Sequence, residues 1–199
     1  MENTHKDKDE LSQSSVTLSS RSVEDRCWFV LRDLKRTNAK LPGYKMLGEL
    51  GVEVFTPMIW KLIEKSGRRI RVRVPFMQDL LFVHSSRKML DPIIDRINTL
   101  QYRYVRGGNC LPMTVRTEEM ERFIRAVEAT DMPHYYMPSE IDSSMFGKEI
   151  RIIGGPLNGY VGKLQKMQGS RVKRLFVDLP NLLIASVEVQ PEFIQVIEH

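Results

Sequence analysis

Cysteine and long apolar runs are scarce in this sequence. Its 199 residues include two cysteines, Cys27 and Cys110, which stand far apart with no CxxC spacing and no histidine at ligand spacing. A zinc site or a disulfide framework is therefore not expected, and a reducing compartment fits. No apolar run approaches the roughly 20 residues that span a bilayer. The first residues lack the apolar core of a signal peptide, so we expect a cytoplasmic protein with no membrane partner.

Motifs for catalysis are missing as well. The four histidines are scattered, and no two of them have i, i+4 spacing. Neither GxxxxGK[ST] nor GxGxxG occurs, so no phosphate-binding loop is predicted. No serine has the strand-turn-helix context of a nucleophile elbow. We therefore expect a protein that is not an enzyme and that carries no metal or cofactor.

Positive charge is present in moderate excess. The formal net charge is +5 and the pI is about 9.2. This charge favours an anionic partner such as nucleic acid, and a merely solvated basic surface explains it equally well. With 42% hydrophobic residues, the chain can bury a core as one large or two small domains.

The first half of the chain mixes helical and strand patterns. Residues 1–26 are polar and predicted to be disordered. Residues 39–50 predict a helix, which ends at Gly51 and whose regular part begins near Leu41 because of Pro42. The apolar run 27–32 predicts a strand, and residues 86–99 predict another helix. Pro92 favours a start of that helix near Asp91. Residues 101–106 alternate as a strand, and residues 117–128 carry the apolar face of another helix.

The stretch 52–86 is the most distinctive part of the chain. Three apolar residues alternate with three arginines: Ile70, Val72 and Val74 with Arg69, Arg71 and Arg73. A period of two predicts a half-buried strand. Gly67 supplies a turn, and Pro75 marks an edge or a break before the apolar run 80–83. We predict a basic β-hairpin that leads into a buried strand.

From residue 146 onward every pattern is that of a strand. Short alternating runs, separated by glycine, proline or polar turns, lie at 149–153, 161–165, 172–179, 184–189 and 193–197. Such a series predicts a small β-barrel. Residues 131–145 contain two prolines and are predicted to be a linker. The fold class is therefore α+β, with a mixed domain at 27–130 and an all-β domain at 146–199.

A glycine-rich signature, GKEIRIIGGPLNGYVGKL, opens the second domain at residues 147–164. An alternating strand leads into Gly155 and Pro156, Gly159 follows, and Gly162 begins the next strand. Glycine permits sharp turns and a close approach of neighbouring strands. The pattern resembles the KOW motif of NusG-type transcription factors and several ribosomal proteins.

The preceding domain resembles the N-terminal domain of NusG along nearly its whole length. The matching segments are the strand at 28–32, the junction LGVEVFTP at 50–57 and the strand at 75–83. The resemblance, which covers residues 27–197, implies a NusG N-terminal α/β sandwich followed by a small all-β KOW barrel of the SH3-like type. Residues 56–59 and the basic turn look more like the specialised paralogues of the RfaH and UpxY types. The UpxY-type paralogues are antiterminators of capsular polysaccharide operons.

This resemblance implies a transcription elongation and antitermination factor. It would bind the clamp helices of the largest RNA polymerase subunit and suppress pausing and termination in a specific long operon. The alternative is a ribosome- or RNA-binding KOW protein without a polymerase role. The positions that match the polymerase contacts are Trp28, Phe76, Met77, Leu80 and Phe82. The family's Pro-Gly-Tyr is replaced by Gln-Asp-Leu at 78–80, so Phe76 and Leu80 are expected as exposed contacts, with burial as the equal alternative.

Nucleic-acid contacts are implied in the same way. Positions that touch non-template DNA in the specialised paralogues match Lys35, Arg36, Lys40 and Tyr44. The cations would bind phosphate and the tyrosine would stack on a base, although a solvated loop is the competing interpretation. The hairpin arginines would contact polymerase or upstream DNA, or would only solubilise that face; they are Arg68, Arg69, Arg71 and Arg73. Non-template DNA or nascent RNA is the expected nucleic-acid partner.

In the barrel, Leu157 and Tyr160 match the surface through which relatives bind a ribosomal protein or the termination factor Rho. Exposed apolar residues at a turn fit a partner site. The strands between 171 and 197 have high β-propensity, so we expect a permanent barrel rather than one that refolds as helices. We expect a monomer.

Overall fold

The computed structural model describes residues 26–35 and 39–197. Most of the predicted disordered tail, and Arg36 of the basic loop, lie outside the described residues. The elements in chain order are β1 (Cys27–Asp33), α2 (Gly43–Glu49), β2 (Glu53–Phe55), β3 (Met58–Lys65), β4 (Arg68–Pro75), β5 (Leu81–Ser85), α3 (Arg87–Arg96), β6 (Leu100–Tyr102), β7 (Thr114–Val115), α4 (Thr117–Glu128), β8 (His134–Tyr136), β9 (Phe146–Ile152), β10 (Val161–Gln165), β11 (Lys173–Leu179), β12 (Leu183–Val189) and β13 (Ile194–Val196). Short 3₁₀ turns occupy Pro138–Glu140, Ser143–Met145 and Pro191–Phe193.

The first sheet has the strand order β2-β5-β1-β6, with β7 also paired to β1. Its central strand β1 is apolar at successive positions because both of its faces are covered. Phe29 and Leu31 pack with Leu47 of α2 and Leu90 of α3 in one cluster. Residues of the opposite face, Trp28 among them, belong to a second cluster that includes α4. The predicted strand at 27–32 is confirmed.

The starts of two helices differ from the pattern-based expectation. Helix α2 begins at Gly43, directly after Pro42 and two residues later than the predicted start of its regular part at Leu41. Helix α3 begins at Arg87, and Pro92 lies inside it, so the expected start near Asp91 is wrong. The N–H that proline lacks would have bonded to the carbonyl of Lys88, which lies in the exposed first turn, so the helix tolerates the loss.

The second sheet has the order β13-β9-β10-β11-β12-β8. Strands β9 to β13 confirm the five predicted runs to within a few residues at their ends. Strand β8 falls within the predicted linker and pairs with β12, where Tyr135 lies opposite Ala185. Among the described residues the pairing path has two ends, β13 and β8, so the structure does not confirm a closed barrel.

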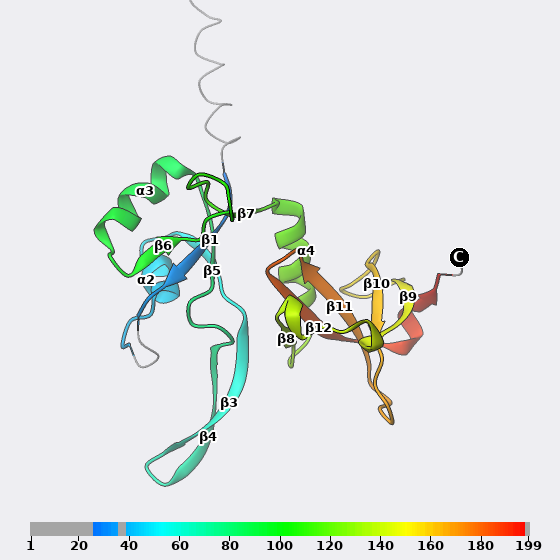
Figure 1. Cartoon of the computed structure of the whole chain (residues 1–199). Helices are drawn as coiled ribbons and strands as arrows, with labels where there is room; N and C mark the ends of the chain where they lie inside the picture. Colours follow the sequence, from blue (N-terminus) through cyan, green and yellow to red (C-terminus); the bar gives the residue numbers. More distant parts are fainter. Residues whose placement is uncertain (1–25, 36–38, 198–199) are drawn as a thin grey trace, which may run out of the picture.

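Helix α4 joins the two sheets. It contacts β1 on one side and β11 and β12 on the other, and Figure 1 shows it beside the strands of the second sheet. Phe123 of α4 and Phe82 of β5 share one apolar cluster with Ile150 and Val187 of the second sheet. The apolar core is therefore continuous from the first sheet to the second.

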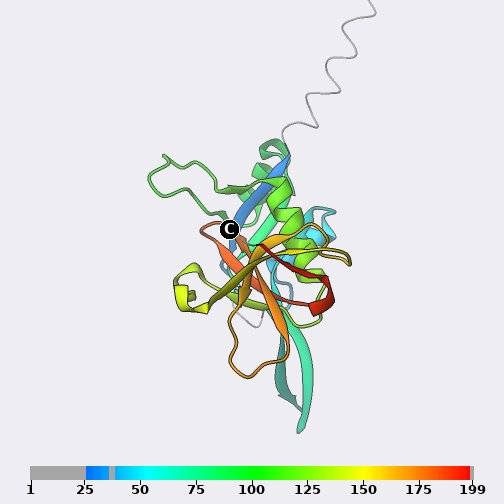
Figure 2. The same cartoon turned by 90° about the vertical axis from the view of Figure 1, so that its right-hand side faces the viewer.

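Strands β3 and β4 pair only with each other among the described strands. Their hairpin projects away from both sheets in Figures 1 and 2. The predicted hairpin is confirmed, but the expected half-burial is wrong for its outer part. Leu62 is 67% exposed and Ile70 is 37% exposed, because no other described strand pairs with these arms.

None of the helices in the described part of the chain is long and apolar enough to cross a membrane.

Candidate functional site

Three of the five predicted polymerase contacts are buried. The exposed fractions of Trp28, Leu80 and Phe82 are 2%, 1% and 0%. The Phe82 ring lies 6.2 Å from the ring of Phe55, in the cluster between the first sheet and α4. The expectation of an exposed contact at Leu80 is therefore wrong in this structure. Alternation points Leu81 toward α2 and α3, and it points Leu80 toward α4.

The remaining two predicted polymerase contacts, Phe76 and Met77, are half-buried at the base of the hairpin. A groove of about 370 Å³ lies there, lined by Ile59, Trp60, Phe76 and residues 132–136. The Phe76 ring is 5.4 Å from the ring of Tyr135, which comes from β8. Burial raises the pKa of the Tyr135 phenol, and the lining of the groove is mainly apolar and aromatic. Phe76 is the one predicted polymerase contact among the described residues that line this groove.

The hairpin arginines point into solvent. All four are exposed, and none forms an ion pair within the described part of the chain. The guanidinium carbon of Arg71 lies 4.5 Å from the Trp60 ring centroid, and that of Arg73 lies 5.8 Å from it. Trp60 Nε1 donates to the carbonyl of Asp131, 3.2 Å away, which fixes the ring. The structure therefore adds an aromatic ring to the predicted basic cluster.

The described residues predicted to contact DNA differ in how accessible they are. Lys35 Nζ donates to the carbonyl of Leu41 at 2.7 Å, so this ammonium group holds the loop itself. Lys40 is exposed, and Tyr44 is half-buried in the first turn of α2. Tyr44 lines a cavity of about 440 Å³ together with Arg73 and Trp60. One predicted loop residue and one predicted hairpin residue therefore meet at a common cavity.

The glycine-rich turn before β10 has the expected geometry. Gly155 and Gly159 have φ values of 65° and 83°, the left-handed region that favours glycine. A Cβ at Gly162 would lie 3.1 Å from the Phe176 carbonyl oxygen. The prediction that Gly162 allows close strand approach is therefore supported. Pro156 lies in this turn and is exposed.

Tyr160 lies against α4, and Leu157 belongs to the same buried apolar cluster instead of facing a partner. Their exposed fractions are 5% and 4%, so the expected exposure of this surface is wrong in this structure. The Tyr160 hydroxyl donates to the Arg122 carbonyl of α4. The Arg122 guanidinium lies 4.9 Å from the Tyr160 ring centroid and donates to the Val161 carbonyl at 2.8 Å. Burial raises the pKa of Tyr160.

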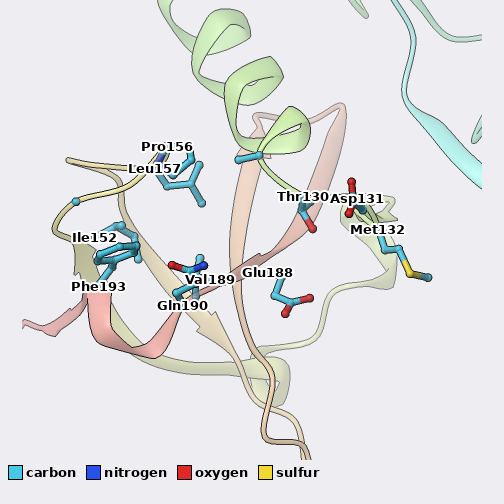
Figure 3. Close-up of a pocket in the computed structure, with 12 residues that line it drawn as sticks. Thr130, Asp131, Met132, Ile152, Pro156, Leu157, Glu188, Val189, Gln190 and Phe193 are labelled. Atoms are coloured by element: carbon cyan, nitrogen blue, oxygen red, sulfur yellow. The ribbon is translucent and has the colours of Figure 1, made fainter.

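A cavity of about 430 Å³ lies where the end of α4 meets the glycine-rich turn, as Figure 3 shows. Asp131 and Glu188 are the charged residues among the described side chains that line it. Across residues 26–35 and 39–197, no group of three or more His, Cys, Asp or Glu side chains is placed to hold a metal ion.

Residues 26–124 match the protein-family model NusG, described as "Transcription termination factor nusG". The chain carries a NusG-family domain. This confirms the predicted family resemblance for the first domain.

One solved structure, described as "Domain interaction in Thermotoga maritima NusG", is similar to this chain at 13% identity and a TM-score of 0.46. The alignment covers 88% of this chain and 99% of the Thermotoga chain. No curated protein sequence matches.

The NusG-family match ends inside α4, at residue 124. The last four residues of α4 lie beyond the match, as does strand β8, which pairs with β12 of the second sheet. Sequence patterns missed β8 because three residues are too few to show alternation. They also place Arg174 on a basic surface of the second domain, whereas it is 5% exposed and donates from Nη2 to the Met132 carbonyl at 2.9 Å. Desolvation lowers the pKa of Arg174. Through its hydrogen bond to Met132, Arg174 holds the segment before β8 against the second sheet.

Proposed function

We propose that the protein is a transcription elongation and antitermination factor that binds RNA polymerase through its NusG-family domain. The family match over residues 26–124 is the observation that carries this proposal. The likeness of residues 56–59 to specialised paralogues supports a role in one long operon, such as a capsular polysaccharide operon. Non-template DNA and nascent RNA are the proposed nucleic-acid partners.

The mechanism needs no bond-making chemistry. A protein that binds one conformation of polymerase better than another shifts the polymerase toward that conformation. Binding across the clamp in its closed form would reduce pausing. The binding energy would come from apolar burial, which the described surface offers at the groove beside Phe76.

Within this groove, Ile59, Phe76 and Tyr135 supply an apolar concave surface at the root of the projecting hairpin. We propose that it receives the tip of the polymerase clamp helices, the partner implied by the family resemblance. Leu80 and Phe82 are buried beneath α4, so they would act by holding the strand that presents Phe76.

Binding of a ribosomal protein or Rho by the second domain has a structural requirement. Leu157 and Tyr160 are buried and Tyr160 is bonded to α4, so any partner that uses Tyr160 must displace α4. Such an exchange would expose apolar side chains of the shared core. We therefore propose that polymerase binds at the groove beside Phe76, and that a partner binds the surface around Tyr160 only when α4 is displaced.

The substitution Phe76→Ala tests the groove. Removing the ring should weaken binding to purified RNA polymerase by tenfold or more, since a central aromatic contact is often worth about 2 kcal/mol or more. Binding is measured by biolayer interferometry, and folding is checked by thermal unfolding. Met89→Ala is the matched control, because Met89 is 55% exposed on α3 and does not line the groove.

Equal binding by folded Phe76→Ala and Met89→Ala would refute the groove assignment. Absence of polymerase binding by the wild type, with salt-sensitive co-sedimentation with ribosomes, would favour the alternative KOW function. In cells, deletion of the gene should reduce distal transcripts of one long operon and leave other operons unchanged.

A further inference from the structure

The hairpin holds the entire excess charge of the molecule. Between residues 58 and 75 there are six cationic side chains and one acidic side chain, a formal charge of +5. This equals the formal net charge of the whole chain. Because the hairpin projects from both sheets, this charge is concentrated on one extended ribbon (Figures 1 and 2).

One face of this ribbon combines the charge with aromatic and apolar surface. Directly paired residues share a face of an antiparallel ribbon. The pairs Trp60–Arg73, Leu62–Arg71 and Glu64–Arg69 therefore lie on one face. Trp60 is 43% exposed and Leu62 is 67% exposed. Three arginines thus form a row along β4, with an exposed indole and an exposed leucine beside them.

We propose that this face, defined by Trp60, Leu62, Arg69, Arg71 and Arg73, binds single-stranded nucleic acid. The arginines would contact successive phosphates, because alternate residues of a strand are spaced by about 6.7 Å. An unpaired base would stack on the indole, which every base can do because each has a π-face. These guanidinium groups form no ion pair in the described part of the chain, so their charge is available to select a polyanion.

The indole is held ready for stacking. Its N–H donates to the Asp131 carbonyl, and the Arg71 guanidinium lies 4.5 Å from its centroid. A fixed ring loses little side-chain freedom when a base binds. Glu64 opposes Arg69 nearest the tip, so the strongest attraction is expected at Arg71 and Arg73, next to the ring.

The test uses the full chain without polymerase, so its outcome is independent of the proposed polymerase groove. Fluorescence anisotropy measures binding to labelled single strands of about twelve nucleotides, as DNA and as RNA, and to a duplex of equal length. The wild type should bind single strands of at least one sugar type more tightly than duplex. Binding should also quench tryptophan fluorescence, because Trp60 is exposed whereas Trp28 is buried.

Two variants separate stacking from charge. Trp60→Leu should weaken single-strand binding by about 5- to 150-fold with an unchanged salt slope. The triple variant Arg69→Gln, Arg71→Gln, Arg73→Gln should flatten the slope of log K against log salt by about two, since each phosphate contact contributes about 0.7.

The matched control removes the same charge elsewhere, through the exposed residues Lys88, Arg96 and Lys148, each changed to Gln. It should bind nearly as the wild type does. If it loses as much affinity as the hairpin triple variant, only long-range charge acts and the proposal fails. Tighter binding to duplex, or full affinity in Trp60→Leu, overturns the proposal as well.

Discussion

Asp33 and Gly43 show how one contact fixes the start of a helix. The buried Asp33 carboxylate accepts from the Gly43 N–H at 2.5 Å and from the Lys35 N–H at 3.0 Å. It therefore satisfies an N–H at the first turn of α2, which has no side-chain cap of its own. A Cβ at Gly43 would lie 2.8 Å from Asp33 Oδ2 and 2.9 Å from Leu100 Cδ2. Only glycine fits this position without movement.

The substitution Gly43→Ala should lower the free energy of unfolding by about 1–3 kcal/mol, because the extra methyl group overpacks the site. Gly48→Ala is the control in the same helix. Its Cβ would meet nothing within 4 Å, so it should raise stability by up to about 1 kcal/mol. Urea denaturation measures both, and equal effects of the same sign would contradict the packing described at Gly43.

Residue burial could be predicted only in part. Alternation in the run 80–83 predicts that neighbours face opposite ways, as Leu80 and Leu81 do. It does not reveal that both faces are covered, because the cover on the Leu80 side is α4, about 40 residues away in the chain. The same limit applies to Leu157 and Tyr160, which resemble an exposed patch until α4 is placed.

At the scale of elements, α3 is tied to the sheet by a short polar network. Arg87 Nε donates to Asp91 Oδ1 at 2.8 Å, and the Tyr102 hydroxyl donates to the same oxygen at 2.7 Å. The hydrogen bond from Arg87, followed by that from Tyr102, holds the pKa of Asp91 below its usual value of 3.8. The ionised carboxylate therefore stabilises the helix docking.

A group with a lowered pKa contributes stability above its unfolded pKa and loses it as pH falls through the folded value. Asp91→Asn should therefore be less stable than the wild type at about pH 6, and the difference should shrink toward zero at about pH 2. Asp95→Asn is the control, because exposed Asp95 forms no ion pair in the described part of the chain. A difference for Asp91→Asn that stays constant with pH, measured by denaturant titration, would contradict the network.

Element types were more predictable than their ends and partners. Helix α4 and strand β10 fall at the predicted residues because their periodicity is local. The pairing of β8 with β12 joins residues about 50 positions apart in the sequence. The hydrogen bond from Arg174 to the Met132 carbonyl, which supports this pairing, leaves no local sequence pattern. The hairpin was predictable from its alternation, but its exposure depends on what the rest of the fold leaves uncovered.

At the scale of the whole molecule, one apolar core runs from the first sheet through α4 to the second sheet. Because packed groups that share a core unfold cooperatively, we expect one transition instead of two. Leu157→Ala should lower stability by about 2–5 kcal/mol and should shift the transition seen by Trp28 equally. The unfolding transition is followed by Trp28 fluorescence in a Trp60→Phe background and, separately, by far-UV circular dichroism. Different unfolding midpoints from the two signals would contradict a shared core.

The most direct measurement of the proposed function is single-round transcription with purified RNA polymerase across a pause site and a terminator. We predict that the wild-type protein shortens pauses and increases full-length transcript, and that Phe76→Ala does so much less at equal concentration. The groove beside Phe76 would then be the surface through which the NusG-family domain acts. Unchanged pausing and termination with the wild-type protein present at saturation would contradict this account.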